Sequence, residues 1–213
     1  MNKIKGVLLD LDNTLYDYDT CNFNANAKVF LKMSERHKLP YGRIENYFRS
    51  ARNQVKSLLG GTAASHSRLL YFKKMIENIQ GSTDSKFSLY CNDLYWQEYF
   101  KRMSLKKPAE KFLASCKNKN IKIAIITDLT TEIQLKKIIK LGISKYVSFI
   151  ITSEEIGKDK PDPEIFHYAL DRLNCKPKEA IMVGDDIRRD IISAKRLGIK
   201  VYKSFNEIPK NFP

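Results

Sequence analysis

The chain has 213 residues, of which 43% are hydrophobic, so it can form one large domain or a domain with a sizeable insertion. Its formal net charge is +14, but no basic tail or arginine-rich run concentrates the excess, and we do not expect a nucleic-acid partner. No apolar stretch has the length of a membrane span or the form of a signal peptide. These features predict a cytoplasmic protein without membrane association, present as a monomer or a homodimer.

The first predicted element is a buried strand at residues 4–10, and a long helical region follows it. Between residues 16 and 104 the apolar residues recur at helical spacing, and no strand-like alternation competes with that pattern. Helices are predicted at residues 26–37, 44–59, 68–79 and 92–103, with a turn at residues 59–65. We therefore predict an all-helical insertion at residues 16–104.

After the insertion, apolar runs alternate with helical segments. Strands are predicted at residues 121–127, 146–152, 179–185 and 199–204, and helices at residues 131–142, 163–173 and 186–198. Such alternation is typical of a parallel sheet with helices on both faces. The predicted fold class is α/β, with a doubly wound parallel-sheet core formed by residues 1–15 and 105–213.

Polar and charged side chains gather where the predicted strands end. In chain order they are Asp10, Asp12, Thr127, Asp128, Lys160, Asp185, Asp186 and Asp190. Ligands of open parallel sheets bind beyond the carboxyl ends of the strands, so we expect these side chains to form one site.

The carboxylates in this set indicate a bound cation, because clustered carboxylates repel one another and are costly to bury. A site made of oxygen atoms alone selects a hard ion such as Mg²⁺. The three histidines lie outside these segments and the four cysteines form no CxxC pair, so we do not expect zinc. We therefore predict Mg²⁺ as the cofactor.

Four motifs in this order resemble those of the haloacid dehalogenase-like hydrolase superfamily. DLDNT at residues 10–14 matches the first motif, DxDx(T/V), and the strand that ends at Thr127 matches the second. Lys160 before a proline matches the third, and GDDIRRD at residues 184–190 matches the fourth, GDxxxxD. The helical insertion is similar to the C1-type cap of the family, so the resemblance covers essentially the whole chain.

The resemblance implies a phosphatase that works through an aspartyl-phosphate intermediate. In that mechanism Asp10 is the nucleophile, and Asp12 protonates the leaving oxygen and later activates water. Thr127, the backbone N–H of Asp128 and Lys160 hold the phosphate.

The same resemblance implies how the metal is held. The Asp10 carboxylate, the Asp12 backbone carbonyl and Asp185 would bind Mg²⁺ directly. Asp190 would orient metal-bound water from behind these ligands, and Asp186 would share that task.

The reaction class is narrowed by Asp12, because dehalogenases and phosphonatases of the family lack this second aspartate. We expect a phosphomonoesterase acting on a small phosphorylated metabolite, such as a sugar phosphate or a nucleotide. Three alternatives stay open: a nucleic-acid end phosphatase, a phosphomutase and a non-catalytic phosphate-binding regulator.

Substrate specificity is expected to come from the cap, which in this family closes over the site. The candidate contacts are Tyr16, Tyr18, His66 and Arg68. Arg68 would suit a carboxylate or a second anionic group, since a guanidinium binds such groups through two parallel hydrogen bonds.

Overall fold

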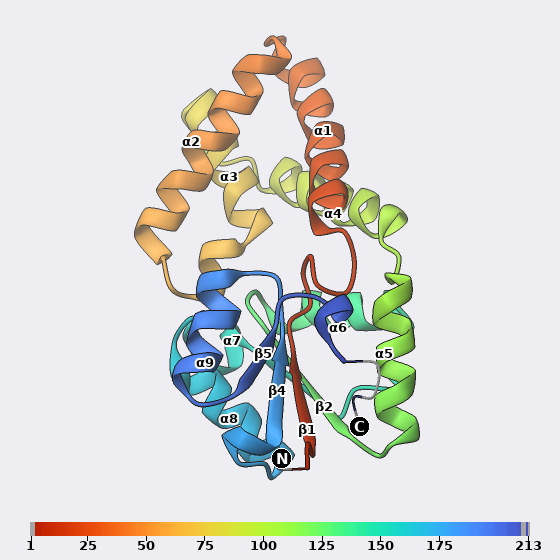
Figure 1. Ribbon diagram of the computed structural model, residues 1–213. Coiled ribbons are helices and arrows are strands. Elements are labelled where there is room, and N and C mark those ends of the chain that lie inside the picture. The colour runs from red at the N-terminus through yellow and green to blue at the C-terminus, as the bar shows by residue number, and fades with distance from the viewer. Residues whose placement is uncertain (1–2, 210–211, 213) are drawn as a thin grey trace. The chain divides into compact units, whose positions relative to one another are not determined.

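The computed structural model describes residues 3–209 and 212. The chain divides into two compact units: a core unit of residues 1–17 and 104–213, and a helical unit of residues 18–103. These boundaries fall within two residues of those expected from the sequence, with Tyr16 and Asp17 on the core side. Figure 1 shows the strands of the core unit and the helices of the helical unit.

Within the described residues, the core unit contains a five-stranded sheet. Its strands are β1 (Gly6–Leu9), β2 (Lys122–Thr127), β3 (Phe149–Thr152), β4 (Ala180–Val183) and β5 (Lys200–Tyr202). They lie in the order β3-β2-β1-β4-β5, and every neighbouring pair is parallel. The predicted α/β class and the doubly wound sheet are confirmed, although each strand is shorter than its apolar run suggested.

Helices cover both faces of this sheet. They are α5 (Lys107–Asn118), α6 (Thr131–Lys140), α7 (Ser153–Ile156), α8 (Pro163–Leu173) and α9 (Ser193–Arg196). Figure 1 shows α8 and α9 on one side of the sheet and α5 and α6 on the other. The register aligns Leu8 with Ala124 and Met182, and these residues pack with Phe166 and Ala194 into one buried cluster. Because successive side chains of a strand point to opposite faces of the sheet, Val7 and Leu9 lie on the other face.

The helical unit is built from helices throughout its described length, as the sequence predicts. They are α1 (Tyr18–His37), α2 (Tyr41–Leu59), η1 (Ala63–His66), α3 (Arg68–Gln80) and α4 (Ser85–Arg102). The predicted turn at residues 59–65 contains the short 3₁₀-helix η1 as well as the turn at Gly60 and Gly61.

The core of the helical unit is aromatic. The ring centroids of Phe30 on α1 and Phe48 on α2 are 5.0 Å apart, and those of Phe72 on α3 and Tyr95 on α4 are 5.7 Å apart. Such pairs add roughly 0.5–1.5 kcal/mol each beyond the area they bury. The aromatic residues that recur at helical spacing in this part of the sequence thus hold its helices together.

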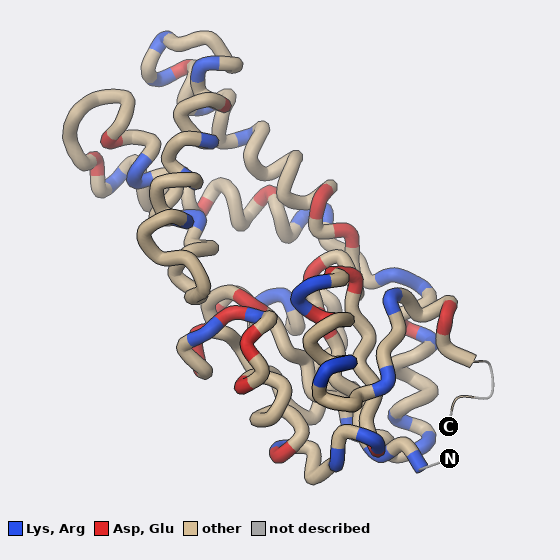
Figure 2. Tube along the Cα trace, turned by 60° about the vertical axis from the view of Figure 1, so that its left-hand side comes forward, with Lys and Arg blue, Asp and Glu red and all other residues tan. Residues whose placement is uncertain are grey.

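The basic residues do not gather in one region of the molecule, and the cysteines form neither a disulfide nor a cluster. Figure 2 shows Lys and Arg positions spread over both units without a single basic stripe. The cysteines are thiols that form no disulfide, and three of them are buried. Among the described residues, no helix combines the length and the apolar character that a membrane span requires.

The helix predicted at residues 186–198 is present over residues 187–196, but its first part is a π-helix instead of an α-helix. A six-residue π-helical segment, η3 (Ile187–Ile192), is followed by the short α9. The Asp186 carboxylate begins this segment by accepting the backbone N–H groups of Arg188 and Arg189, both at 2.8 Å. Wide turns of this kind occur often at functional sites, and here the turn carries Asp190, which is buried.

Gly184, which directly follows β4, is required by the position of Asp190. A Cβ atom at residue 184 would lie 2.6 Å from Cγ and 2.8 Å from Cβ of Asp190. Neither atom is the free end of a flexible side chain, because the Asp190 carboxylate is itself held by hydrogen bonds. A larger residue at 184 must therefore displace the η3 segment.

We expect Gly184→Ala to lower the free energy of unfolding by about 1–3 kcal/mol, the usual cost of inserting an atom into a filled interior. Urea denaturation followed by circular dichroism measures this change. Gly42→Ala on α2 is the matched control, because its added Cβ meets nothing within 4 Å. Equal stability of the two variants would contradict the close packing of Asp190 on Gly184.

Candidate active site

Strand order brings the predicted site residues together at one edge of the sheet. β1 lies between β2 and β4, so Asp10 after β1 is adjacent to Thr127 at the end of β2 and to Asp185 after β4. Lys160 reaches the same point from the loop between α7 and α8. The sequence prediction that the strand ends form one site agrees with this arrangement.

Lys160 lies between two buried carboxylates. Its Nζ donates to Asp10 Oδ1 at 2.6 Å and to Asp190 Oδ1 at 2.8 Å, and the side chains of all three are less than 10% exposed. Burial disfavours the ammonium form, but the attraction of Asp10 and Asp190 outweighs burial and raises the pKa of Lys160 above its ordinary value. Lys160 is therefore a permanent cation at the centre of the site.

The carboxylates around Lys160 still carry more negative charge than one ammonium compensates. Burial, with the repulsion of Asp190 and Asp12, raises the pKa of Asp10 to about 7, despite the opposing effect of Lys160. Burial also raises the pKa values of Asp185 and Asp190. Raised carboxyl pKa values mark a place where a further positive charge would be favourable.

Thr14 links the first and fourth motifs. Its hydroxyl lies 2.8 Å from Asp10 Oδ2 and 3.2 Å from Asp185 Oδ1, and it accepts the backbone N–H of Asp185 at 3.2 Å. The turn after β1, with Asn13 in the left-handed region at φ 64°, directs Thr14 back toward Asp10. Thr14 thus fixes the spacing of the two carboxylates.

The donor set fits a divalent cation. Oxygen atoms of Asp10, Asp185 and Asp190 all lie within 4.8 Å of one another. Both oxygens of Asp190 already accept hydrogen bonds, from Lys160 at 2.8 Å and from the backbone N–H of Asp186 at 3.3 Å. Asp10 and Asp185 are therefore the better direct ligands, and an all-oxygen set of this kind suits Mg²⁺.

The charge count supports the same conclusion. The acidic side chains that meet at this edge of the core unit are Asp10, Asp12, Asp128, Asp159, Asp185, Asp186 and Asp190, and the cations among them are Lys137, Lys160 and Arg189. Seven carboxylates against three cations leave a charge of −4 when all are ionised. A divalent cation would offset part of that charge.

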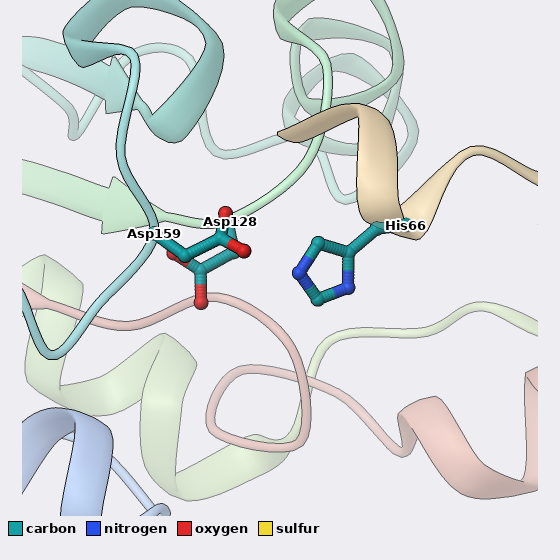
Figure 3. A group of neighbouring side chains, drawn as sticks. All are labelled: His66, Asp128 and Asp159. Atoms are coloured by element: carbon teal, nitrogen blue, oxygen red, sulfur yellow. The ribbon is translucent and has the colours of Figure 1, made fainter. Parts of the chain in front are cut away.

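Asp128 connects two loops of the site. Its Oδ1 accepts the backbone N–H of Lys160 at 2.8 Å, and its Oδ2 lies 3.2 Å from Nη1 of Arg189. Figure 3 shows the Asp128 and Asp159 side chains next to one another, from the end of β2 and from the loop ahead of α8. The acidic side chain at position 128 therefore has a structural use, and Arg189 was not among the residues singled out from the sequence.

Two further residues of the site, Lys137 and Gln134, were missed because both lie on a predicted surface helix. Lys137 Nζ donates to Asp12 Oδ1 at 2.7 Å and to Oδ2 at 2.9 Å. Gln134 Nε2 donates to Thr127 Oγ1 at 2.6 Å and to the Asp128 carbonyl at 2.5 Å. Their spacing of three, which puts them on one face of α6, was the available signal.

The predicted specificity residues separate into two groups. Tyr16 belongs to the core unit, is fully buried, and donates its hydroxyl to Asp12 Oδ1. The Tyr16 hydroxyl is therefore engaged with the Asp12 carboxylate. Tyr18, His66 (drawn in Figure 3) and Arg68 belong to the helical unit.

Arg68 is a buried cation in the helical unit. Its Nε donates to Tyr95 Oη at 3.0 Å, its Nη1 to the His66 carbonyl at 2.7 Å, and its Nη2 to Tyr18 Oη at 2.5 Å. The guanidinium also lies over the Tyr71 ring, 5.4 Å from its centroid. Its Nη2 also lies 3.5 Å from Asn22 Oδ1, and among the described residues no carboxylate pairs with Arg68.

Comparison with known proteins identifies the family. The haloacid dehalogenase-like hydrolase family profile matches residues 7–203. Ribulose-1,5-bisphosphate 5-phosphatase of Halopiger xanaduensis is 40% identical over 195 residues, which cover 91% of this chain and 82% of that protein. Glyceraldehyde 3-phosphate phosphatase of Methanocaldococcus jannaschii is 30% identical over 202 residues, covering 92% and 82%.

The fold has close counterparts among solved structures. The crystal structure of a HAD phosphatase from Thermococcus onnurineus matches with a TM-score of 0.75 at 21% identity, covering 96% of this chain and 95% of that one. The profile match spans all four motifs, from the strand before Asp10 to beyond Asp190. The chain belongs to the haloacid dehalogenase-like hydrolase family.

Proposed function

We propose that this protein is a Mg²⁺-dependent phosphomonoesterase that hydrolyses a small phosphorylated metabolite through an aspartyl-phosphate on Asp10. The main supporting observation is the buried Asp10 carboxylate, held by Lys160 and Thr14 beside Asp185. Its relatives at 30–40% identity are named phosphatases of ribulose 1,5-bisphosphate and glyceraldehyde 3-phosphate. The protein is a phosphatase that acts on small phosphorylated metabolites.

The residues of the core unit suit both steps of the reaction. Asp10 attacks phosphorus, and the leaving oxygen takes a proton from Asp12 as its bond to phosphorus breaks. Water then attacks the aspartyl-phosphate, Asp12 accepts the proton of that water, and inorganic phosphate leaves. Thr127 Oγ1, the backbone N–H of Asp128 and Lys160 Nζ hold the phosphate oxygens and stabilise their charge in both transition states.

Mg²⁺ is the proposed cofactor, held by the Asp10 carboxylate, the Asp12 backbone carbonyl and the Asp185 carboxylate. When bound, it offsets the negative charge of Asp10 so that an anionic phosphate can approach an anionic nucleophile. Asp190 holds Lys160 and the η3 turn in position behind these ligands. Asp186, whose carboxylate begins η3, acts on the metal site only through that turn.

The substrate we propose is a sugar phosphate that carries a second anionic group. Arg68 supports this choice, because a buried guanidinium without a carboxylate partner is costly unless an anion binds it. Tyr18 and His66, which contact Arg68, are proposed as neighbours of that group. The name of the relative from Halopiger xanaduensis, a bisphosphate phosphatase, agrees with such a substrate.

We expect the wild-type protein to hydrolyse a sugar phosphate in the presence of Mg²⁺, and EDTA or Asp10→Asn to reduce the rate to background. Phosphate release over a panel of sugar phosphates, sugar bisphosphates, nucleotides and 5′-phosphorylated oligonucleotides measures this. Asp171→Asn, an exposed aspartate on α8, should retain full activity. Hydrolysis that persists in Asp10→Asn would contradict the nucleophile assignment, and preference for oligonucleotides would contradict the substrate class.

We expect Arg68→Met to raise KM for a sugar bisphosphate by about 10- to 100-fold, since a charge-assisted hydrogen bond contributes about 1.5–3 kcal/mol. KM for the corresponding monophosphate should change far less. Steady-state kinetics on ribulose 1,5-bisphosphate and ribulose 5-phosphate measures the difference, and Arg43→Met, an exposed arginine on α2, is the control. An equal change in KM for both substrates would remove Arg68 from substrate recognition.

A further inference from the structure

Lys137 is buried in a position that ordinary packing does not explain. Its side chain is 1% exposed, although it lies on α6 beside Lys136, whose side chain is 54% exposed. A buried ammonium is costly unless it is paired and hydrogen-bonded. Lys137 is paired with Asp12, which in the proposed reaction moves protons.

The contact between Lys137 and Asp12 involves both carboxylate oxygens. Nζ lies 2.7 Å from Oδ1 and 2.9 Å from Oδ2, so the ammonium fixes the plane of the carboxylate as well as its distance. The Tyr16 hydroxyl donates to Oδ1 from a second direction. The Lys137 ammonium is also 5.9 Å from the centroid of the Tyr16 ring, so Lys137, Tyr16 and Asp12 form one contact group.

All members of this group belong to the core unit, but they come from separate segments. Asp12 and Tyr16 lie in the loop after β1, and Lys137 lies on α6 more than one hundred residues later. Asp12 is 29% exposed at its side chain, whereas Lys137 and Tyr16 are covered. The exposed part of Asp12 is therefore available to a substrate while its support is protected from solvent.

We propose that Lys137 is a positioning residue that holds the Asp12 carboxylate in the one orientation from which it serves both proton transfers. This inference builds on the proposed phosphatase mechanism. Lys137 donates to both oxygens of Asp12, so we expect its main effect on the steps that use Asp12. A small misplacement of an acid or base can reduce a rate by a large factor.

The proposal predicts that loss of Lys137 affects two kinds of substrate differently, depending on whether the leaving group needs a proton. A sugar alkoxide needs a proton from Asp12 as it leaves, whereas p-nitrophenolate leaves without one. Both substrates give the same aspartyl-phosphate, and its hydrolysis needs Asp12 to accept a proton from water. Loss of Lys137 should slow both steps for the sugar phosphate but only the second step for p-nitrophenyl phosphate.

We expect Lys137→Met to lower kcat on the best sugar phosphate by about 100-fold, within the usual range for general acid–base catalysis, with little change in KM. The first turnover of p-nitrophenyl phosphate, followed by stopped-flow absorbance, should keep its wild-type rate and appear as a burst before a slow steady state. Lys137→Arg, which keeps the charge, should recover part of the lost kcat. Lys136→Met is the matched control on the same helix.

A double-mutant cycle tests whether Lys137 acts through Asp12. In an Asp12→Asn background, Lys137→Met should cause no further loss, because the group it positions is already absent. Full additivity of the two losses would overturn the proposal. An equal loss in the first turnover and in the steady state of p-nitrophenyl phosphate would overturn it as well, and so would an unchanged kcat.

The outcome of the wild-type assay separates this proposal from the proposed function. A wild-type protein that hydrolyses no phosphoester would overturn the function and this inference together. An active wild-type protein with an inactive Asp10→Asn variant, but with additive Lys137 and Asp12 effects, would overturn this inference alone. If Lys137→Met does not fold by circular dichroism, Lys137→Gln, which keeps an N–H donor without the charge, replaces it in every comparison.

Discussion

The buried contact of Lys160 with Asp10 and Asp190 is the interaction on which the site depends. Carboxylates at the ends of neighbouring strands repel one another, and the ammonium between them makes their burial possible. Removing one partner of a buried pair typically costs about 3–5 kcal/mol, more than an ordinary packing defect. The same contact brings together the first, third and fourth motifs, because each of its three members comes from a different one.

The rest of the core unit maintains this cluster at fixed spacing. Thr14 joins Asp10 to Asp185, and Gly184 leaves room for Asp190. The residues Asp128 and Arg189 join the loop after β2 to the turn after β4. The loops after β1, β2 and β4 and the loop ahead of α8 are each held by a hydrogen bond or ion pair of a carboxylate, so the sheet edge presents the proposed metal ligands and phosphate-binding groups at fixed spacing. Preorganisation of this kind is the main source of electrostatic catalysis.

The helix α6 adds a second layer to the site from behind. Gln134 donates to Thr127 Oγ1 at 2.6 Å, and the Thr127 hydroxyl donates to the Asp128 carbonyl at 3.4 Å, so Thr127 is held on both sides. Lys137, one turn further along, supports Asp12. One helix face therefore supports both the residue proposed to bind phosphate and the residue proposed to move protons.

Much of this protein could be predicted from its sequence because the signals are local. Apolar runs that end in Asp10, Thr127 or Asp185 specify both the strands and the polar groups that follow them. A parallel sheet then brings those groups to one edge whatever the details of packing. The aromatic spacing between residues 16 and 104 likewise specifies helices, since it matches the helical period.

Tertiary structure decided what local patterns could not. On α6 the apolar Ile139 is 72% exposed while the charged Lys137 is buried, the reverse of what hydropathy predicts. The reason is that Asp12, distant in sequence, offers a buried ammonium a partner, and pairing across the fold outweighs the preference of a single helix. The π-helical turn at residues 187–192 also replaces a regular helix where the buried Asp190 must meet Lys160. The sequence by itself determined the fold class and the position of polar residues at the strand ends, whereas the partners of each charge were set only when the strands and helices packed together.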